Sequence, residues 1–191
     1  MNIEIYYFSG TGNSFAVARE ISEKTNGKLI PIPTVMNQDH ITTNADVIGI
    51  IFPVYYTGII NIPLIVQRFV MKLENINKPY IFAVCTYGGG FGTTLKLLDK
   101  MINSRGGRLS SGFGVHMPQN AFTKPFENKE KLYQDWKKEK LATICECVLA
   151  KQEYQFDTDS ILIKPVVNIL ERIMKTAIFK PLFLKSMSNT A

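Results

Sequence analysis

The hydrophobic positions of the chain fall into short continuous runs separated by longer stretches of helical spacing. Near-continuous runs of apolar, β-branched and aromatic residues are typical of strands that are covered on both faces. Such runs occupy residues 3–8, 46–52 and 80–86, and weaker runs occupy residues 28–31 and 108–115. The pattern therefore predicts five strands, three of them fully buried.

The stretches between these runs predict helices. Apolar side chains recur every three or four positions over residues 14–24 and 94–102, and residues 64–72 follow Pro63, which suits a first helical turn. Residues 129–151 keep roughly helical spacing, and we interpret them as one long helix. Strands that alternate with helices form parallel sheets with right-handed crossovers. The sequence therefore predicts an α/β fold built on a five-stranded parallel sheet.

The character of the sequence changes near residue 155. A chain of 191 residues is long enough for one core and an appendage. Residues 156–191 are apolar with spaced basic side chains, and they are interrupted by Pro165 and Pro181. We therefore expect one domain over residues 1–155 and a basic, apolar, helical extension over residues 156–191.

Composition narrows the classes of protein that fit. With 46% hydrophobic and 20% charged residues, the chain is typical of a globular protein and unlike a disordered or fibrous one. The formal net charge is +6, and much of it lies in residues 161–191. Such a segment could contact an acidic protein or an anionic membrane surface, or could be only a solvated basic face. We expect no nucleic-acid partner and leave the membrane contact open.

The cysteines and histidines do not form a recognisable reactive set. Cys85, Cys145 and Cys147 fit neither a disulfide framework nor a metal knuckle, so a reducing cytoplasm is the expected compartment. His40 and His116 are far apart in the sequence and have no neighbouring cysteine or carboxylate pattern. We therefore predict no metal site and assign no catalytic residue.

The loop after the first predicted strand combines glycines with small polar residues. It consists of Ser9, Gly10, Thr11, Gly12, Asn13 and Ser14. Glycine lets the backbone turn sharply and approach a ligand, and the following helix offers unpaired N–H groups and the positive end of its dipole. The hydroxyl groups add further donors, so neutral groups alone could surround a phosphate.

The residues after Gly12 do not match two other phosphate-binding motifs. A Walker loop needs a lysine after its last glycine, whereas Gly12 is followed by Asn13 and Ser14. A dinucleotide-binding motif needs a third glycine where this chain has Phe15. A nucleoside triphosphate or a dinucleotide is therefore disfavoured, and the loop predicts a phosphate monoester.

Two further loops should lie beside the first one, because ligands of such sheets bind at the carboxyl ends of the strands. The second loop contains Pro53, Val54, Tyr55, Tyr56, Thr57 and Gly58. Its paired tyrosines could cover a flat ring, or could serve packing only. The third loop contains Thr86, Tyr87, Gly88, Gly89, Gly90, Phe91 and Gly92. Its glycines could let backbone N–H groups approach the polar edge of a ring, or could only make a flexible turn.

Together, these loops resemble those of the flavodoxin family, with residues 9–14 in the place of the phosphate loop. Three short segments are similar to one subgroup, in which a flavodoxin domain is fused to a two-cluster ferredoxin. These segments are Phe52-Pro53-Val54-Tyr55, Thr86-Tyr87-Gly88-Gly89 and Met117-Pro118-Gln119-Asn120. The resemblance covers residues 1–155, and the chain lacks the Cys-x-x-Cys motifs of the ferredoxin part. We expect either a stand-alone relative or one part of such a fusion.

The resemblance implies a flavodoxin-like three-layer sandwich with strand order 2-1-3-4-5 and one noncovalently bound FMN. It places Tyr55 or Tyr56 against one face of the flavin, Tyr87 near the other, and Asn120 at the border of the pocket. It implies an electron carrier whose partner is an iron–sulfur protein, such as a two-cluster ferredoxin module of the same full-length chain, or another redox protein. The alternatives are an FMN-dependent NAD(P)H reductase of quinone-like acceptors and a non-redox binding module that docks through residues 161–184.

Overall fold

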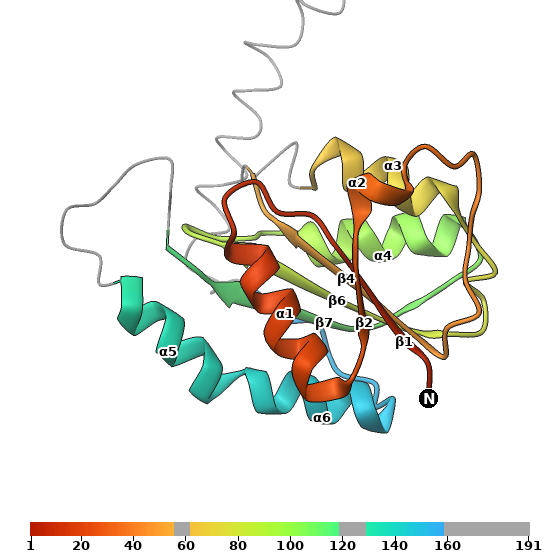
Figure 1. Ribbon diagram of the computed structural model, residues 1–191. Coiled ribbons are helices and arrows are strands. Elements are labelled where there is room, and N and C mark those ends of the chain that lie inside the picture. The colour runs from red at the N-terminus through yellow and green to blue at the C-terminus, as the bar shows by residue number, and fades with distance from the viewer. Residues whose placement is uncertain (56–61, 119–128, 159–191) are drawn as a thin grey trace, which may run out of the picture.

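The computed structural model describes residues 1–55, 62–118 and 129–158. Five of the strands in these residues pair in parallel to form one sheet, in the order β2-β1-β4-β6-β7 (Figure 1). They are β1 (Ile3–Tyr7), β2 (Lys28–Pro31), β4 (Val47–Pro53), β6 (Tyr80–Tyr87) and β7 (Leu109–His116). Counted within this sheet alone, the order is 2-1-3-4-5, so the predicted α/β fold, its five parallel strands and their order are confirmed.

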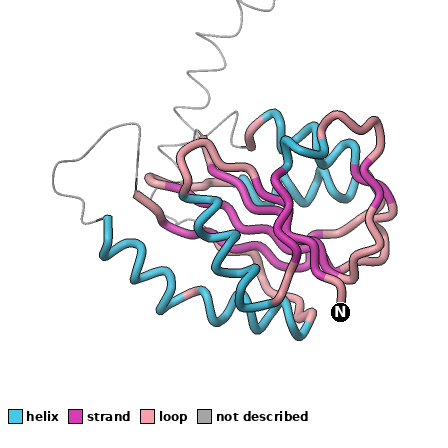
Figure 2. The backbone as a smooth tube through the Cα atoms, in the orientation of Figure 1, coloured by secondary structure: helices cyan, strands magenta, loops and turns pink. Residues whose placement is uncertain are grey.

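Helices cover both faces of the sheet, which gives three layers (Figure 2). One face carries α1 (Asn13–Thr25), α5 (Lys129–Glu139) and α6 (Leu141–Ala150). The other face carries α2 (Ile32–Val35), α3 (Leu64–Lys72) and α4 (Thr94–Ser104). The central strands therefore cross the molecule between two apolar layers, as their continuous apolar runs indicate.

Strand β4 shows how one segment supplies two cores. Ile48, Ile50 and Phe52 belong to the core under α2, α3 and α4. Val47 and Ile51 point the other way and belong to the core under α1, α5 and α6. All five side chains are fully buried. Because burial of one such side chain contributes about 1.5–3 kcal/mol, the central strands hold the sheet and both helical layers together.

Two features of the fold differ from the sequence pattern. A second, two-stranded parallel sheet joins β3 (Ile41–Thr42) to β5 (Leu73–Glu74). Each of these strands has two residues, too few for an alternation of apolar and polar positions to be recognised. The prediction of one long helix over residues 129–151 is wrong, because the chain bends at Lys140, between α5 and α6.

The bend at Lys140 has a tertiary cause. The ammonium group of Lys140 donates hydrogen bonds to the carbonyl oxygen of Gly114 at 2.6 Å and to the carboxylate of Asp157 at 2.6 Å. The helix therefore turns where its side chain bonds to the edge of β7. Trp136 and Leu141, the buried residues on either side, are five positions apart, a spacing that a straight helix does not keep on one face.

The chain after α6 runs along the free edge of β7, and we call residues 154–157 the edge strap. The N–H of Tyr154 donates to the carbonyl oxygen of Ser110 at 3.1 Å, and the N–H of Asp157 donates to that of Gly112 at 2.9 Å. Both bonds advance in the same direction along the two segments, so the strap runs parallel to β7. Close packing of the described chain continues beyond residue 155, and the division into two domains stays a prediction.

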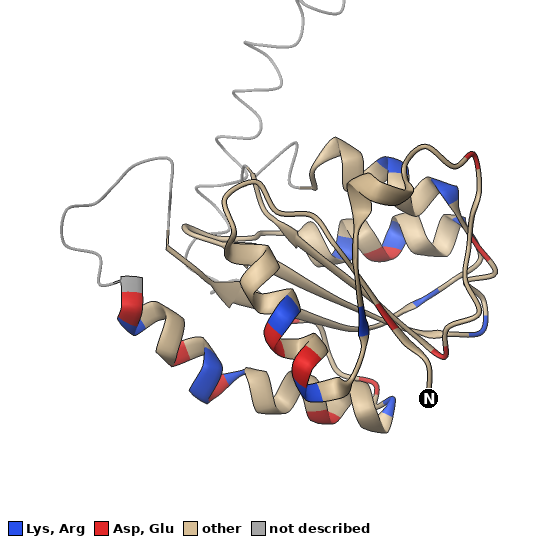
Figure 3. Cartoon of the chain, in the orientation of Figure 1, with Lys and Arg blue, Asp and Glu red and all other residues tan. Residues whose placement is uncertain are grey.

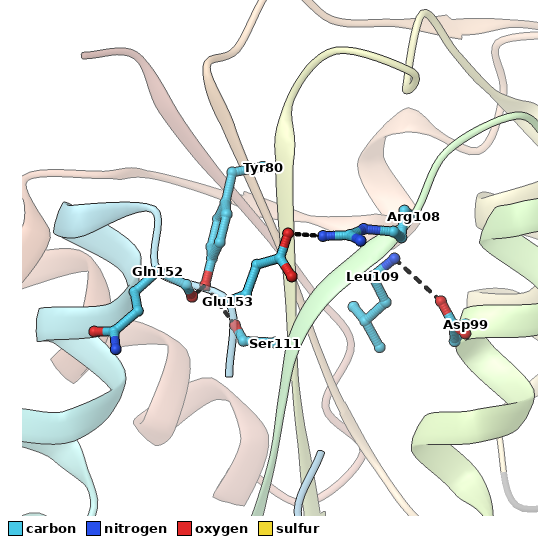
Figure 4. A network of polar contacts seen from close by, with 7 residues as sticks. All are labelled: Tyr80, Asp99, Arg108, Leu109, Ser111, Gln152 and Glu153. Atoms are coloured by element: carbon cyan, nitrogen blue, oxygen red, sulfur yellow. Dashed lines mark hydrogen bonds and ion pairs between the residues drawn. The ribbon is translucent and has the colours of Figure 1, made fainter. Parts of the chain in front are cut away.

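Polar contacts fasten the chain where the strap begins (Figure 4). The Tyr80 hydroxyl lies 2.6 Å from the carbonyl oxygen of Gln152 and 2.7 Å from the Ser111 hydroxyl. Because a carbonyl oxygen only accepts, Tyr80 donates to Gln152 and accepts from Ser111. Burial raises the pKa of Tyr80, so its hydroxyl stays protonated as a donor. Arg108 and Glu153 add an exposed ion pair.

We predict that Asp157→Ala lowers the free energy of unfolding by about 1–2 kcal/mol, because its carboxylate binds both the Lys140 ammonium and the Gly114 N–H. Glu153→Ala, immediately before the edge strap, is the matched control. Its ion pair with Arg108 has side chains 70% and 61% exposed and should contribute less than about 0.5 kcal/mol. Urea unfolding followed by circular dichroism measures both variants, and equal losses would contradict the assignment.

Candidate functional site

The loop between β1 and α1 has the backbone geometry that its glycines predict. Gly12 precedes α1 with a φ of 97°, in the left-handed region that residues with a side chain rarely adopt. Its N–H donates to the hydroxyl oxygen of Ser9 at 3.0 Å, which closes the turn. Gly10, Thr11 and Gly12 are exposed. The first N–H groups of α1 follow directly, where a helix leaves them without partners inside the helix.

Neutral residues form the loops at the carboxyl ends of β1, β4 and β6. Residues 8–15, 53–55 and 88–93 include no acidic or basic side chain. The first turns of α1, α3 and α4 contain no acidic residue either. Figure 3 shows the described parts of these loops in tan, with the coloured charges further along the helices. An anion at this edge would therefore be held by N–H and O–H donors and by the positive end of the α1 dipole.

The structure brings the first loop into contact with the second and third loops. The Ser14 and Thr86 hydroxyl groups are buried, and their oxygen atoms lie 2.7 Å apart. The Tyr55 hydroxyl lies beside Gly10, where a Cβ atom would stand 3.1 Å from it. Segments that are distant in the sequence therefore meet at one edge of the sheet, as the positions of the loops after their strands predict.

The end of β7 and the loop after it also reach this edge, through His116 and Pro118. The Asn13 side-chain amide donates to the carbonyl oxygen of Pro118 at 2.9 Å. A ring nitrogen of His116 lies 2.9 Å from the carbonyl oxygen of Gly88 in the third loop. Pro118 belongs to the segment 117–120 that resembles the fused subgroup, whereas the sequence pattern gives His116 no role at this edge. The place of His116 beside the third loop follows from the pairing of β7 with β6.

The two described tyrosines of the predicted ring site have different surroundings. Tyr55 is 48% exposed and meets Phe8 edge-on, with ring centroids 6.3 Å apart. Partial burial raises the pKa of Tyr55, so its hydroxyl stays neutral. Tyr87 is half-buried, and its ring packs against Phe91 at 4.9 Å and His116 at 5.4 Å. Tyr55 therefore offers an open face to a ligand, whereas Tyr87 is held by its neighbours.

Other predicted residues lie along the same edge. Pro53 ends β4, and the N–H of Val54 donates to the carbonyl oxygen of Thr86 at 2.8 Å. Gly89 is exposed, and Gly92 has a φ of 50° just before α4 begins. The third loop thus uses at least one of its glycines for a conformation that side chains disfavour.

Four predicted site residues lie outside the described residues: Tyr56, Thr57, Gly58 and Asn120. Residues 159–191, which make up most of the predicted extension, also lie outside them. The roles assigned to these residues stay predictions.

The described residues contain no cluster of three or more His, Cys, Asp or Glu side chains that could bind a metal ion. Cys85, Cys145 and Cys147 are buried thiols. Burial raises the pKa of Cys145 to about 11 and also raises that of Cys147. Across the same residues, no helix has both the length and the hydropathy to span a membrane.

Comparison with solved structures identifies the fold. Neither protein-family models nor curated proteins give a match to the sequence. A flavodoxin of Streptococcus pneumoniae TIGR4 matches with a TM-score of 0.53 and 17% identity, over 79% of this chain and 99% of that chain. A flavodoxin from the domain Archaea matches with a TM-score of 0.50 and 18% identity, over 78% and 99% of the two chains. The fold is flavodoxin-like.

One of the matched structures is that of an enzyme. The apo form of an NADH:FMN oxidoreductase matches with a TM-score of 0.55 and 14% identity, over 81% of this chain and 91% of that chain. The flavodoxin-like sandwich implied by the three loops is therefore confirmed. The relation to the subgroup fused to a ferredoxin stays a prediction.

We predict that the native protein reacts slowly with a chromogenic disulfide reagent at pH 8. A thiol with a pKa of about 11, such as Cys145, is ionised in about one molecule in a thousand at that pH, and only the thiolate attacks. All three thiols of the chain should react once urea unfolds it. A fast-reacting thiol in the native protein would show that one of them is accessible and activated.

Proposed function

We propose that this flavodoxin-like protein binds FMN noncovalently at the carboxyl edge of its sheet and carries electrons to or from a redox partner protein. The observation that supports this most directly is the uncharged loop of residues 9–14, in which left-handed Gly12 leads into the start of α1. Such a loop suits a single phosphate group. A triphosphate would need the lysine and metal ion of a Walker loop.

The residues of this edge fit the parts of FMN. A Cβ atom built on Gly12 would meet no atom within 4 Å, so no other part of the described chain fills the space directly beside this glycine. Tyr55 stands next to Gly10 and offers an exposed aromatic face to a planar ring. Residues 9–14 would hold the phosphate, Tyr55 would cover the ring, and the glycine-rich backbone of residues 86–92 would bond its polar edge.

When bound, FMN supplies the redox chemistry, and the protein sets its potential through stacking, hydrogen bonds and nearby charge. The helix starts at this edge add no negative charge, because the first turns of α1, α3 and α4 lack acidic residues. Carboxylates beside a flavin would oppose its reduction to an anion. The described residues at this edge would therefore oppose reduction of the bound flavin less than a set of carboxylates at the same positions would.

An exposed edge favours electron transfer between proteins. Phe15 in the first turn of α1 is 37% exposed, and Tyr55 is 48% exposed. Exposed aromatic side chains are enriched in protein interfaces, where they supply contact area. We propose an iron–sulfur protein, such as a two-cluster ferredoxin, as the partner. This choice is supported by the similarity of residues 52–55, 86–89 and 117–120 to flavodoxin domains that are fused to such a ferredoxin.

A second candidate function is an FMN-dependent NAD(P)H reductase of quinone-like acceptors. The structural match to an NADH:FMN oxidoreductase, which covers 81% of this chain, favours it. Such an enzyme would bind the nicotinamide over the flavin ring before the quinone, so hydride transfer from NAD(P)H would be fast.

The two functions predict different kinetics. For a carrier, NADH and NADPH should bleach the bound flavin slowly, whereas dithionite-reduced protein should pass electrons to an oxidised two-cluster ferredoxin within the mixing time. Stopped-flow absorbance in the flavin bands measures both reactions. Rapid bleaching by NADH or NADPH, followed by sustained reduction of a quinone, would instead establish the reductase.

We predict that Gly12→Ala weakens FMN binding about 5- to 30-fold. Alanine disfavours the left-handed φ, so the free loop should relax to another conformation, and FMN binding would have to restore the original one at a cost of about 1–2 kcal/mol. Gly106→Ala is the matched control. Gly106 has a φ of 82° but lies just before β7, at the amino ends of the strands and away from the proposed FMN site. This variant should therefore lose folding stability and keep its FMN affinity. Flavin fluorescence quenching measures the affinities. Failure of the unaltered protein to bind FMN would refute the proposed function.

A further inference from the structure

A pair of buried hydroxyl groups lies at the base of the first loop. Ser14, the second residue of α1, is 1% exposed, and Thr86, near the end of β6, is 3% exposed. Their oxygen atoms lie 2.7 Å apart, and either can be the donor. The pair therefore joins the loop that would hold the phosphate to the loop that would flank the flavin ring.

The pair has one more proton than its contacts use. Each hydroxyl carries one proton, and the bond between the two oxygen atoms uses only one of them. Within the described residues, neither side chain has a second hydrogen-bond partner. Buried polar groups in folded proteins nearly always have partners, supplied by the protein, by water or by a ligand. The spare O–H group is therefore suited to a ligand that brings an acceptor.

The positions of the two residues decide which proton is the spare one. Thr86 is fixed within the sheet, because it pairs with Pro53 and Val115 and its carbonyl oxygen accepts the N–H of Val54. Ser14 stands in the first turn of α1, beside the N–H groups that a phosphate would contact. Of the two, only Ser14 is placed to direct its proton toward a ligand at the helix start.

We propose that Thr86 is a positioning residue of the phosphate site, an inference that rests on the proposed FMN function. Thr86 donates its proton to the Ser14 oxygen, and Ser14 donates its own proton to a phosphate oxygen. Hydrogen bonds to ionised oxygens are about twice as strong as neutral ones, and successive O–H groups polarise one another. Thr86 therefore strengthens phosphate binding without touching the phosphate.

Thr86→Val tests this role, because valine is β-branched like threonine but has no hydroxyl proton. The affinity for FMN should fall about tenfold, as for the loss of one charge-assisted hydrogen bond. The affinity for riboflavin, which has no phosphate, should stay the same. Thr86→Ser returns the donor and should restore FMN binding. Titrations of flavin fluorescence with each variant measure both affinities, and unchanged riboflavin binding also shows that the variant is folded.

Ser14→Ala completes a double-mutant cycle. The double variant should lose little more FMN affinity than Ser14→Ala alone, because Thr86 acts only through Ser14. Additive losses, or equal losses for FMN and riboflavin, would show that Thr86 has a structural role only. If the unaltered protein binds FMN and Thr86→Val binds it equally well, the role of Thr86 is wrong and the proposed function stands. If the unaltered protein binds no flavin, both proposals fail.

Discussion

Burial of the central strands on both faces is the constraint on which the site depends. Strands that are covered by helices above and below must run in the same direction, since each helix returns the chain to the starting edge. The carboxyl ends of β1, β4 and β6 are therefore neighbours, and α1, α3 and α4 all begin at that edge of the sheet. The interaction that stabilises the sheet also gathers loops that are far apart in the sequence.

The parts of the fold that the sequence predicts are those with a local physical cause. β4 and β6 could be recognised because every position from 47 to 52 and from 80 to 85 is buried and apolar, which gives an unbroken apolar run in the sequence. The bend at Lys140 could not be recognised. Its partners Gly114 and Asp157 are 26 and 17 residues away. The spacing of apolar residues along a helix does not indicate that a lysine will bond to a distant strand.

The same distinction applies to the site. The conformation of residues 9–14 is local, because glycine at position 12 permits the left-handed φ that the turn needs, so composition alone indicates it. The contact of Ser14 with Thr86 spans 72 residues, and that of Asn13 with Pro118 spans 105. Such contacts depend on how the strands and helices pack in three dimensions. A short sequence motif does not show which distant residue will be the partner.

The edge strap also bears on solubility. β7 is the outermost strand on its side of the sheet, and the free N–H and C=O groups of an edge strand can pair with another molecule. The strap occupies the carbonyl groups of Ser110 and Gly112 and, through Asp157, the N–H of Gly114. A chain shortened near residue 155, where the composition changes, would expose the hydrogen-bonding groups of the β7 edge. We expect such a chain to self-associate through that edge. A domain produced by itself is better ended after the strap than within it.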